Sequence, residues 1–231
     1  MEMSFSSYQA IDMETWPRRE HYRYYREQLK CGYSLTARLD VTAVLDFARR
    51  RDKRFYGCIL YAAAKTVNEM EEMKLMVTPD GTPGIWDTVH VNFTVFHQDD
   101  RTFSDLWTVY CPDFAAFYQE FQRVLELYGD RHGVKARPDQ PPNFFCISCV
   151  PWMDYTGFTT QSVGEPALFP VITYGKYTEK QGRYTLPVTL TISHAAADGY
   201  HSSLFFKKFQ DANCNNKLDT CLLYTSDAAD D

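Results

Sequence analysis

Hydrophobic and polar residues alternate with a period of two in several short stretches of this chain and recur every three or four positions in others. The clearest alternation runs over Leu186–Ile192. A period of two predicts a strand with one buried face. Directly after it, apolar residues recur at helical spacing over Leu204–Phe209. The segment around His194 is therefore expected to turn from a strand into a helix, and Gly199 gives the backbone the freedom to leave that turn.

The same two periods predict the other elements of the chain. Helices are expected over 14–29, 41–50, 55–70, 113–128 and 200–212. Thr15 is the expected N-cap of the first helix, with Pro17 in its first turn. Strands are expected over 31–39, 89–97, 102–110, 144–150, 171–177 and 183–193, with the last two forming a hairpin. Since strands and helices mix without strict alternation, we predict an α/β (α+β) fold in which an open mixed sheet carries helices on one face.

The length and composition indicate one domain with an aromatic-rich interior. The chain has 231 residues, of which 45% are hydrophobic and 16% aromatic. The turn signal at Thr78–Gly81 marks a further hairpin, and 129–143 and 155–169 are expected to be irregular. From Cys214 onward neither period persists, and 222–230 resembles translated sequencing adapter. We therefore expect a single domain over 1–213 and a non-native or disordered tail over 214–231.

Charge and cysteine usage exclude several classes of function. The net charge of −6 argues against a nucleic-acid partner, since phosphate binding needs a clustered basic surface. No run approaches the roughly 18 apolar residues of a membrane span, and the N-terminus lacks a signal-peptide pattern. Seven scattered cysteines fit a reducing cytoplasm. Cys146 and Cys149 have the spacing of a metal pair, but no second pair follows, so we interpret them as small residues of a strand.

His194 is the first candidate for chemistry because it follows a strand directly. A histidine held by a sheet edge can face a cleft, and imidazole titrates near neutral pH, which suits a general base. The local pattern alone favours a structural histidine in a tight turn, since His-x-x-x-Asp-Gly is a common spacing. A metal site of His194, Asp198 and His201 is a further alternative, although the other histidines form no evident cluster.

Six ordered blocks over residues 5 to 213 together resemble the chloramphenicol acetyltransferases. They are Trp16–His21, Cys31–Thr36, Phe93–Gln98, Ile147–Ser148, Pro151–Trp152 and Ile192–His201. The resemblance implies acetyl transfer from acetyl-CoA to a primary hydroxyl of chloramphenicol, and hence antibiotic resistance. It also implies a two-layer sandwich of the CoA-dependent acyltransferase superfamily and a homotrimer with active sites between neighbouring subunits.

The resemblance also assigns roles to single residues. His194 matches the general base, whose second ring nitrogen is held by the residue's own backbone carbonyl, and Ser148 matches the hydroxyl that stabilises the oxyanion. Thr173 matches a threonine that assists through a bound water. Asp198 matches an aspartate that pairs with Arg18 and holds the shape of the turn, instead of completing a triad.

Two sets of residues are expected to line the ligand sites by the same resemblance. The acceptor pocket is expected to be apolar and aromatic, with Tyr25, Cys31, Tyr33, Phe103 and Phe158. The CoA site is expected to offer an aromatic platform and basic side chains, with Trp152, Lys176, Tyr177, Arg54 and Tyr56, and with Phe55 nearby.

Four positions depart from the family pattern. Ser193 replaces the first of two successive histidines, and Cys146 stands where asparagine is frequent. Asp105 and Thr160 occupy positions that tend to be small or apolar beside the acceptor, where a carboxylate is costly to desolvate. Two alternatives follow: an acyltransferase of the same fold with another hydroxylated acceptor, and a non-catalytic trimeric binding protein. A metal-dependent hydrolase is a third.

Overall fold

The computed structural model describes residues 7–160 and 164–214, and its main feature is a seven-stranded mixed sheet. The strand order is β2-β10-β8-β7-β5-β6, and β9 pairs with β10. The pairs β5–β7 and β7–β8 are parallel, and the remaining pairs are antiparallel. The strands are β2 (Gly32–Asp40), β5 (His90–Phe96), β6 (Phe103–Thr108), β7 (Phe144–Cys149), β8 (Val171–Tyr174), β9 (Thr178–Lys180) and β10 (Arg183–Ser193).

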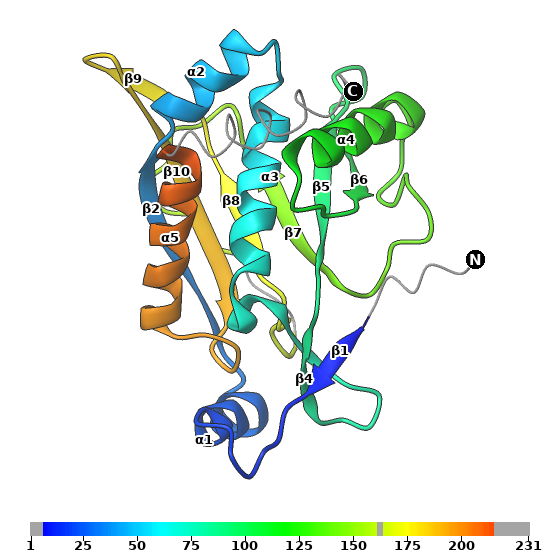
Figure 1. Ribbon diagram of the computed structural model, residues 1–231, viewed down its shortest axis with the longest axis vertical. Helices are drawn as coiled ribbons and strands as arrows, with labels where there is room; N and C mark the ends of the chain where they lie inside the picture. Colours follow the sequence, from blue (N-terminus) through cyan, green and yellow to red (C-terminus); the bar gives the residue numbers. More distant parts are fainter. Residues whose placement is uncertain (1–6, 161–163, 215–231) are drawn as a thin grey trace, which may run out of the picture.

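Helices cover one face of this sheet (Figure 1). They are α2 (Thr42–Arg50), α3 (Phe55–Asn68), α4 (Phe114–Tyr128) and α5 (Gly199–Cys214). The central helix α3 packs against α2, α4 and α5. The predicted mixed sheet with helices on one face is therefore confirmed. Among the described residues, no helix combines the length and apolar character needed to cross a bilayer.

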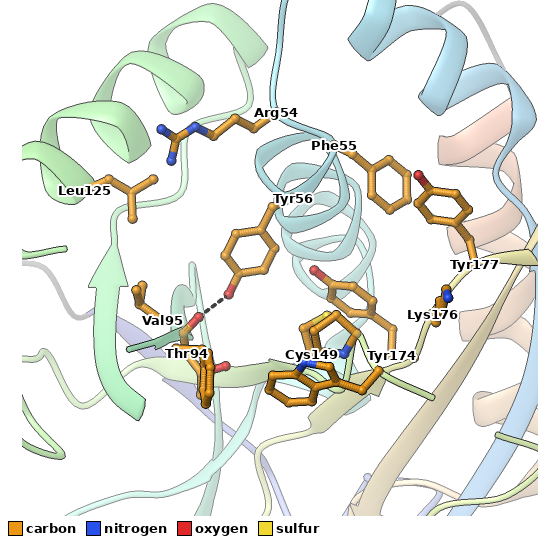
Figure 2. A pocket seen from close by; sticks show the side chains of 14 residues that line it. Arg54, Phe55, Tyr56, Thr94, Val95, Leu125, Cys149, Tyr174, Lys176 and Tyr177 are labelled. Carbon is orange, nitrogen blue, oxygen red and sulfur yellow. Dashed lines mark hydrogen bonds between the residues drawn. The ribbon is translucent and has the colours of Figure 1, made fainter. Parts of the chain in front are cut away.

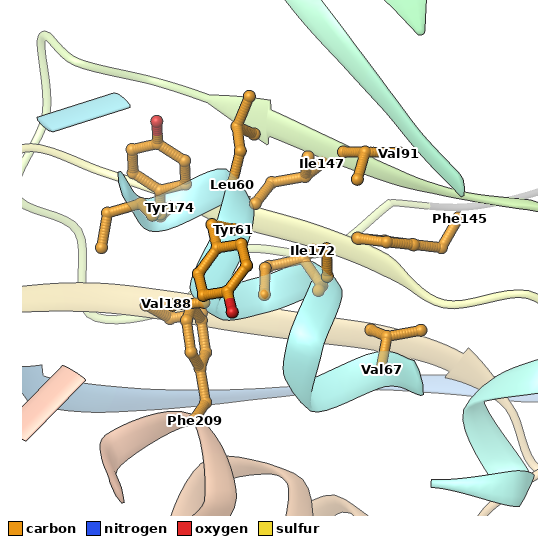
Figure 3. Packing of buried hydrophobic residues seen from close by; sticks show 14 of the residues in the cluster. Leu60, Tyr61, Val67, Val91, Phe145, Ile147, Ile172, Tyr174, Val188 and Phe209 are labelled. Carbon is orange, nitrogen blue, oxygen red and sulfur yellow. The ribbon is translucent and has the colours of Figure 1, made fainter. Parts of the chain in front are cut away.

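The core lies between α3 and the inner face of the sheet (Figure 3). Alternate strand residues such as Phe145, Ile147 and Val188 point toward it and are at most 1% exposed. Leu60 and Phe209 meet them from α3 and α5. Because successive strand residues face opposite ways, the intervening positions lie on the outer face of the sheet. The candidate chemistry of the strands is on that outer face.

The predicted helix over 14–29 is wrong in its first part. The Asp12 carboxylate accepts hydrogen bonds from the Glu14 backbone (2.9 Å) and the Thr15 hydroxyl (2.9 Å), which closes a turn there. Such side-chain bonds compete with helical ones. Helix α1 begins only at Arg19 (Arg19–Arg23) and continues as the π-helix η1 (Tyr24–Gln28). Thr15 is therefore a turn residue and not the N-cap.

Several short elements outside the main sheet are not predicted by the pattern of apolar and polar residues. A second sheet has the order β1-β4-β3, made by β1 (Tyr8–Ala10), β3 (Leu75–Val77) and β4 (Pro83–Trp86). The 3₁₀-helix η2 (Glu71–Lys74) links α3 to it. The turn predicted at Thr78–Gly81 is confirmed as the connection of β3 to β4. The predicted hairpin is also confirmed, since β8 and β9 both pair antiparallel with β10. The predicted tail, apart from Cys214 at the end of α5, lies outside the described residues.

Candidate active site

His194 lies directly after β10, in the turn that leads to α5. Pairing of β10 with β2 extends to Ser193 opposite Gly32, and the His194 backbone N–H donates to the Cys31 carbonyl at 3.0 Å. The imidazole stacks on Tyr25 with ring centroids 3.8 Å apart and an interplanar angle of 8°. Tyr33 meets it edge-on at 5.2 Å. The sheet and the π-helix η1 thus bring three residues of the expected acceptor pocket around His194.

The two nitrogens of the His194 ring have different surroundings. Nδ1 is buried and has no hydrogen-bond partner among the described residues. The expected bond from Nδ1 to the residue's own carbonyl is therefore not present. The ring is oriented by its stacking on Tyr25 instead of by that hydrogen bond. Because Nδ1 is buried, Nε2 is the nitrogen through which the ring can meet a ligand.

Asp198 pairs with Arg18, 180 positions away in sequence. Arg18 Nη1 donates to Asp198 Oδ2 at 2.6 Å, while Asp198 Oδ1 accepts from His201 Nδ1 at 2.8 Å and from the Tyr200 backbone at 3.0 Å. Burial raises the pKa of the Asp198 carboxyl, but the hydrogen bond from Arg18 and the charge of His201 outweigh it and bring the pKa to about 2. The carboxylate thus joins Arg18, the N-cap residue of α1, to the first turn of α5 beside the His194 turn.

Replacing Asp198 by asparagine is expected to lower the melting temperature at pH 7. The folded pKa is depressed from 3.8 to about 2, so the stabilisation is present above pH 4 and is lost as pH falls through that window. For a carboxylate with 32% of its side chain exposed, the loss is about 1 kcal/mol after solvent screening. Arg18, 14% exposed, loses its carboxylate partner as well. Thermal unfolding of both proteins at pH 7 and pH 3 measures this.

The matched control is Asp154→Asn, which breaks the exposed Arg38–Asp154 pair of 2.7 Å. It should change the melting temperature much less. An equal loss in both variants, or a loss for Asp198→Asn that is the same at pH 3, would contradict a structural role for the Arg18–Asp198 pair.

A row of hydroxyl residues crosses the outer face of the sheet. Ser148 of β7 lies opposite Thr173 of β8, which lies opposite Thr189 of β10. On the other side, Ser148 Oγ is 3.4 Å from Thr94 Oγ1 of β5. Tyr155 covers part of the row, since its hydroxyl donates to the Thr173 carbonyl at 2.6 Å. Thr94 was not among the predicted site residues, although the alternation along β5 places it on this face.

One residue of this row, Thr94, also lines a cavity of about 380 Å³ (Figure 2). Five of its lining residues are those expected for CoA: Arg54, Tyr56, Trp152, Lys176 and Tyr177. Thr94 and Cys149 line it as well, and the Tyr56 hydroxyl donates to the Thr94 carbonyl at 2.6 Å. Burial raises the pKa of Tyr56 well above its usual range, so the phenol stays protonated and keeps this bond. The cavity therefore combines aromatic walls with two cations.

A second cavity of about 380 Å³ lies next to the His194 turn. Cys31, Tyr33 and Thr160 are among its lining residues, as is Ser193. The other two residues expected at the acceptor lie elsewhere. Phe103 is on β6 with 53% of its surface exposed, and Phe158 packs near Tyr155 with ring centroids 5.7 Å apart. Within one copy of the chain, the residues expected for the acceptor pocket therefore do not all lie in one cavity.

His194 and Ser148 are far apart within one chain. Ser148 is level with Thr189 across the sheet, because both lie opposite Thr173. Five residues of extended chain at roughly 3.4 Å each then separate this level from His194, about 17 Å in all. No single chain can place both side chains on one reacting group. The chain therefore has two separate candidate half-sites, one around His194 and one around Ser148.

Potential metal ligands gather at one other place among the described residues. One ligand atom each of His97, Asp99 and His132 lies within 4.8 Å of the others. The two imidazoles, however, stack with centroids 4.0 Å apart and an angle of 19°. Ring-nitrogen lone pairs lie in the ring plane, so nearly parallel rings cannot both point at one ion. His201 instead contacts the carboxylates of Asp198 and Glu72, the latter at 3.4 Å.

Comparison with known proteins adds to this geometry. The chloramphenicol acetyltransferase family model matches residues 6–210. Relatives include chloramphenicol acetyltransferases of Streptomyces acrimycini, 38% identical over 87% of this chain and 91% of that protein, and of Vibrio anguillarum, 33% identical over 88% and 93%. A chloramphenicol acetyltransferase 2 of Haemophilus influenzae is 36% identical over 92% and 99%.

Solved structures agree with the family model. A chloramphenicol acetyltransferase matches with a TM-score of 0.79 at 25% identity, over 89% of this chain and 99% of that one. A dihydrolipoamide acetyltransferase of Azotobacter vinelandii has the same fold, with a TM-score of 0.62 at 16% identity over 87% of each chain. The fold and the sequence matches define an acyltransferase enzyme. Within that class, the chain belongs to the chloramphenicol acetyltransferase family.

Proposed function

We propose that this protein transfers the acetyl group of acetyl-CoA to a primary hydroxyl of chloramphenicol and so confers resistance to that antibiotic. The observation that carries the proposal is the cavity of Figure 2, which is lined by the five residues expected for CoA and by Thr94, the neighbour of Ser148. Its aromatic walls suit an adenine ring, and Arg54 and Lys176 suit phosphate groups. The thioester of a CoA molecule bound in this way would then reach the row of hydroxyl residues that contains Ser148.

His194 acts as the general base in this proposal. An alcohol is a weak nucleophile at neutral pH, so Nε2 of His194 takes the hydroxyl proton as the oxygen attacks the thioester carbonyl. The new C–O bond gives a tetrahedral oxyanion, which the Ser148 hydroxyl stabilises by donating a hydrogen bond. Collapse of this intermediate breaks the C–S bond, and the proton on His194 passes to the departing CoA sulfur. Thr173 assists through a bound water.

Each complete site is proposed to form between two copies of the chain. The separation of about 17 Å between the half-sites supports this, at roughly 3.4 Å per strand residue. The exposed Phe103 would then join Tyr25, Cys31 and Tyr33 of a neighbouring copy in one acceptor pocket, with Phe158. The family resemblance implies a homotrimer, which is a closed ring with one site at each of its interfaces. The free cysteines, of which Cys58 is buried, fit the reducing cytoplasm.

Release of CoA thiol from acetyl-CoA tests the function directly. We expect thiol release that depends on chloramphenicol and yields one acetylated product per thiol, with no metal required. Thermal stabilisation by chloramphenicol without thiol release would favour a non-catalytic binding protein. Loss of activity on chelation would favour metal-dependent hydrolysis. Release with other hydroxylated acceptors, but none with chloramphenicol, would favour the same chemistry on another substrate.

A further inference from the structure

Asp105 places a carboxylate on the same face of the sheet as Ser148. It lies on β6 directly opposite Thr94 of β5, and Thr94 Oγ1 is 3.4 Å from Ser148 Oγ. Side chains of directly opposed residues point to the same face, so Asp105 extends the hydroxyl row by one strand. Phe103, two positions earlier on β6, shares that face.

The backbone of Asp105 is fixed on both sides. Its N–H donates to the Val134 carbonyl at 2.7 Å, and its carbonyl accepts from the Ala136 N–H at 3.3 Å. On the opposite edge β6 is paired with β5 over its whole length. The side chain therefore cannot leave the Ser148 face by a shift of the strand, because a one-residue slip would break both sets of bonds.

Within the described residues, the Asp105 carboxylate has only the charge of Lys135 acting on it from a distance, without direct contact. It is half-buried, and no side-chain hydrogen bond or ion pair involves it there. Burial raises the pKa of Asp105, and the charge of the exposed Lys135 offsets this only in part. The charge of Asp105 also acts on Cys146 of β7. Burial raises the pKa of the Cys146 thiol to about 12, and the Asp105 charge adds to that rise. Cys146 is two residues before Ser148, so a negative charge that Lys135 offsets only in part acts on the part of β7 that carries Ser148.

We propose that Asp105 selects the acceptor, by pairing with a protonated amine on an aromatic, hydroxylated molecule. The inference rests on the proposed function, since it places the acceptor over the Ser148 row. A neutral acceptor that covered this carboxylate would remove its water and offer no charge in return, which is unfavourable. An ammonium group supplies the missing partner, and the exposed Phe103 supplies an apolar surface for the aromatic body.

The test compares two acceptors that differ at one group. Chloramphenicol is neutral, whereas 2-amino-1-(4-nitrophenyl)propane-1,3-diol keeps its ring and both hydroxyls and carries an ammonium in place of the dichloroacetamide. The kcat/KM for each is measured by thiol release at pH 7, and NMR of the product confirms O-acetylation. We expect Asp105→Asn and Asp105→Ala to lower the kcat/KM ratio of amine to chloramphenicol by roughly ten- to hundredfold.

The matched control is Asp99→Asn, an exposed carboxylate in the turn before β6, which should leave the ratio unchanged. An unchanged ratio in both Asp105 variants, or a wild-type protein that acetylates chloramphenicol and not the amine, would overturn this inference and leave the proposed function intact. A wild-type protein that acetylates neither molecule would overturn both. A lower ratio in the Asp105 variants alone supports the pairing, because a merely structural residue would change both acceptors alike.

Discussion

Replacing His194 by alanine is expected to lower kcat by roughly 10²–10⁴-fold, the range attributed to a positioned general base. Without the imidazole, the acceptor hydroxyl must lose its proton to water as it attacks the thioester. The fold should survive, because the His194 backbone bond to the Cys31 carbonyl does not depend on the side chain. Chloramphenicol-dependent thiol release measures the rate, and a melting curve with the oligomeric mass checks the fold.

The control for this variant is His21→Ala, since His21 is exposed on α1 and has no role in the proposed mechanism. It should keep the wild-type rate. A His194→Ala protein that is folded and retains a near-normal rate would remove His194 from the role of base. Loss of activity together with loss of the fold would instead point to the packing of Tyr25 on the imidazole.

The main sheet and the long helices could be predicted from the spacing of their apolar residues, even though α3 is buried on nearly all sides. Strand β10 alternates between core positions such as Val188 and the hydroxyl row, and α3 presents Ile59 and Val67 to the core. Residues that face the core are apolar, so apolar residues recur every two positions in a strand and about every 3.6 positions in a helix. Strands β1, β3 and β4 have only three or four residues, too few to display a period.

The N-terminal helix was mispredicted for a different reason. Its charges and tyrosines suit a helix, but the Asp12 side chain fixes a turn that the pattern of apolar residues does not record. The π-helix η1 that follows carries Tyr25 to the His194 ring. Irregular helices of this kind are frequent at functional sites and depend on tertiary contacts.

The parts of the site differ in how far the sequence reveals them. The strand end at His194 follows from periodicity alone, whereas the contact of Arg18 with Asp198 joins residues 180 positions apart and could be expected only from the family resemblance. Thr94 requires the register between β5 and β7, which single-strand patterns do not contain. The distance between the half-sites also depends on strand order and register.

Ser148→Ala is the second prediction with a large effect, a fall in kcat of roughly 10²–10³-fold. Removing one hydroxyl leaves the oxyanion without the donor proposed for it, while β7 keeps its pairing with β5 and β8. KM for chloramphenicol should change little, since the hydroxyl acts on charge that develops only in the transition state. The control is Ser34→Ala, which removes a hydroxyl from β2 that bonds Thr191 at 2.7 Å. Equal losses in both variants would contradict the oxyanion role.

Mixing the two inactive variants tests where the site is formed. Suppose that His194 of one copy works with Ser148 of the next. In an equal mixture of His194→Ala and Ser148→Ala chains that are refolded together, about a quarter of the interfaces then combine an intact His194 with an intact Ser148 by random assortment. Activity should then rise from near zero to about a quarter of the wild-type value. If each site belonged to one chain, every site would lack one of the two groups and the mixture would stay inactive. The roughly 17 Å of strand between the two levels makes recovery the expected result.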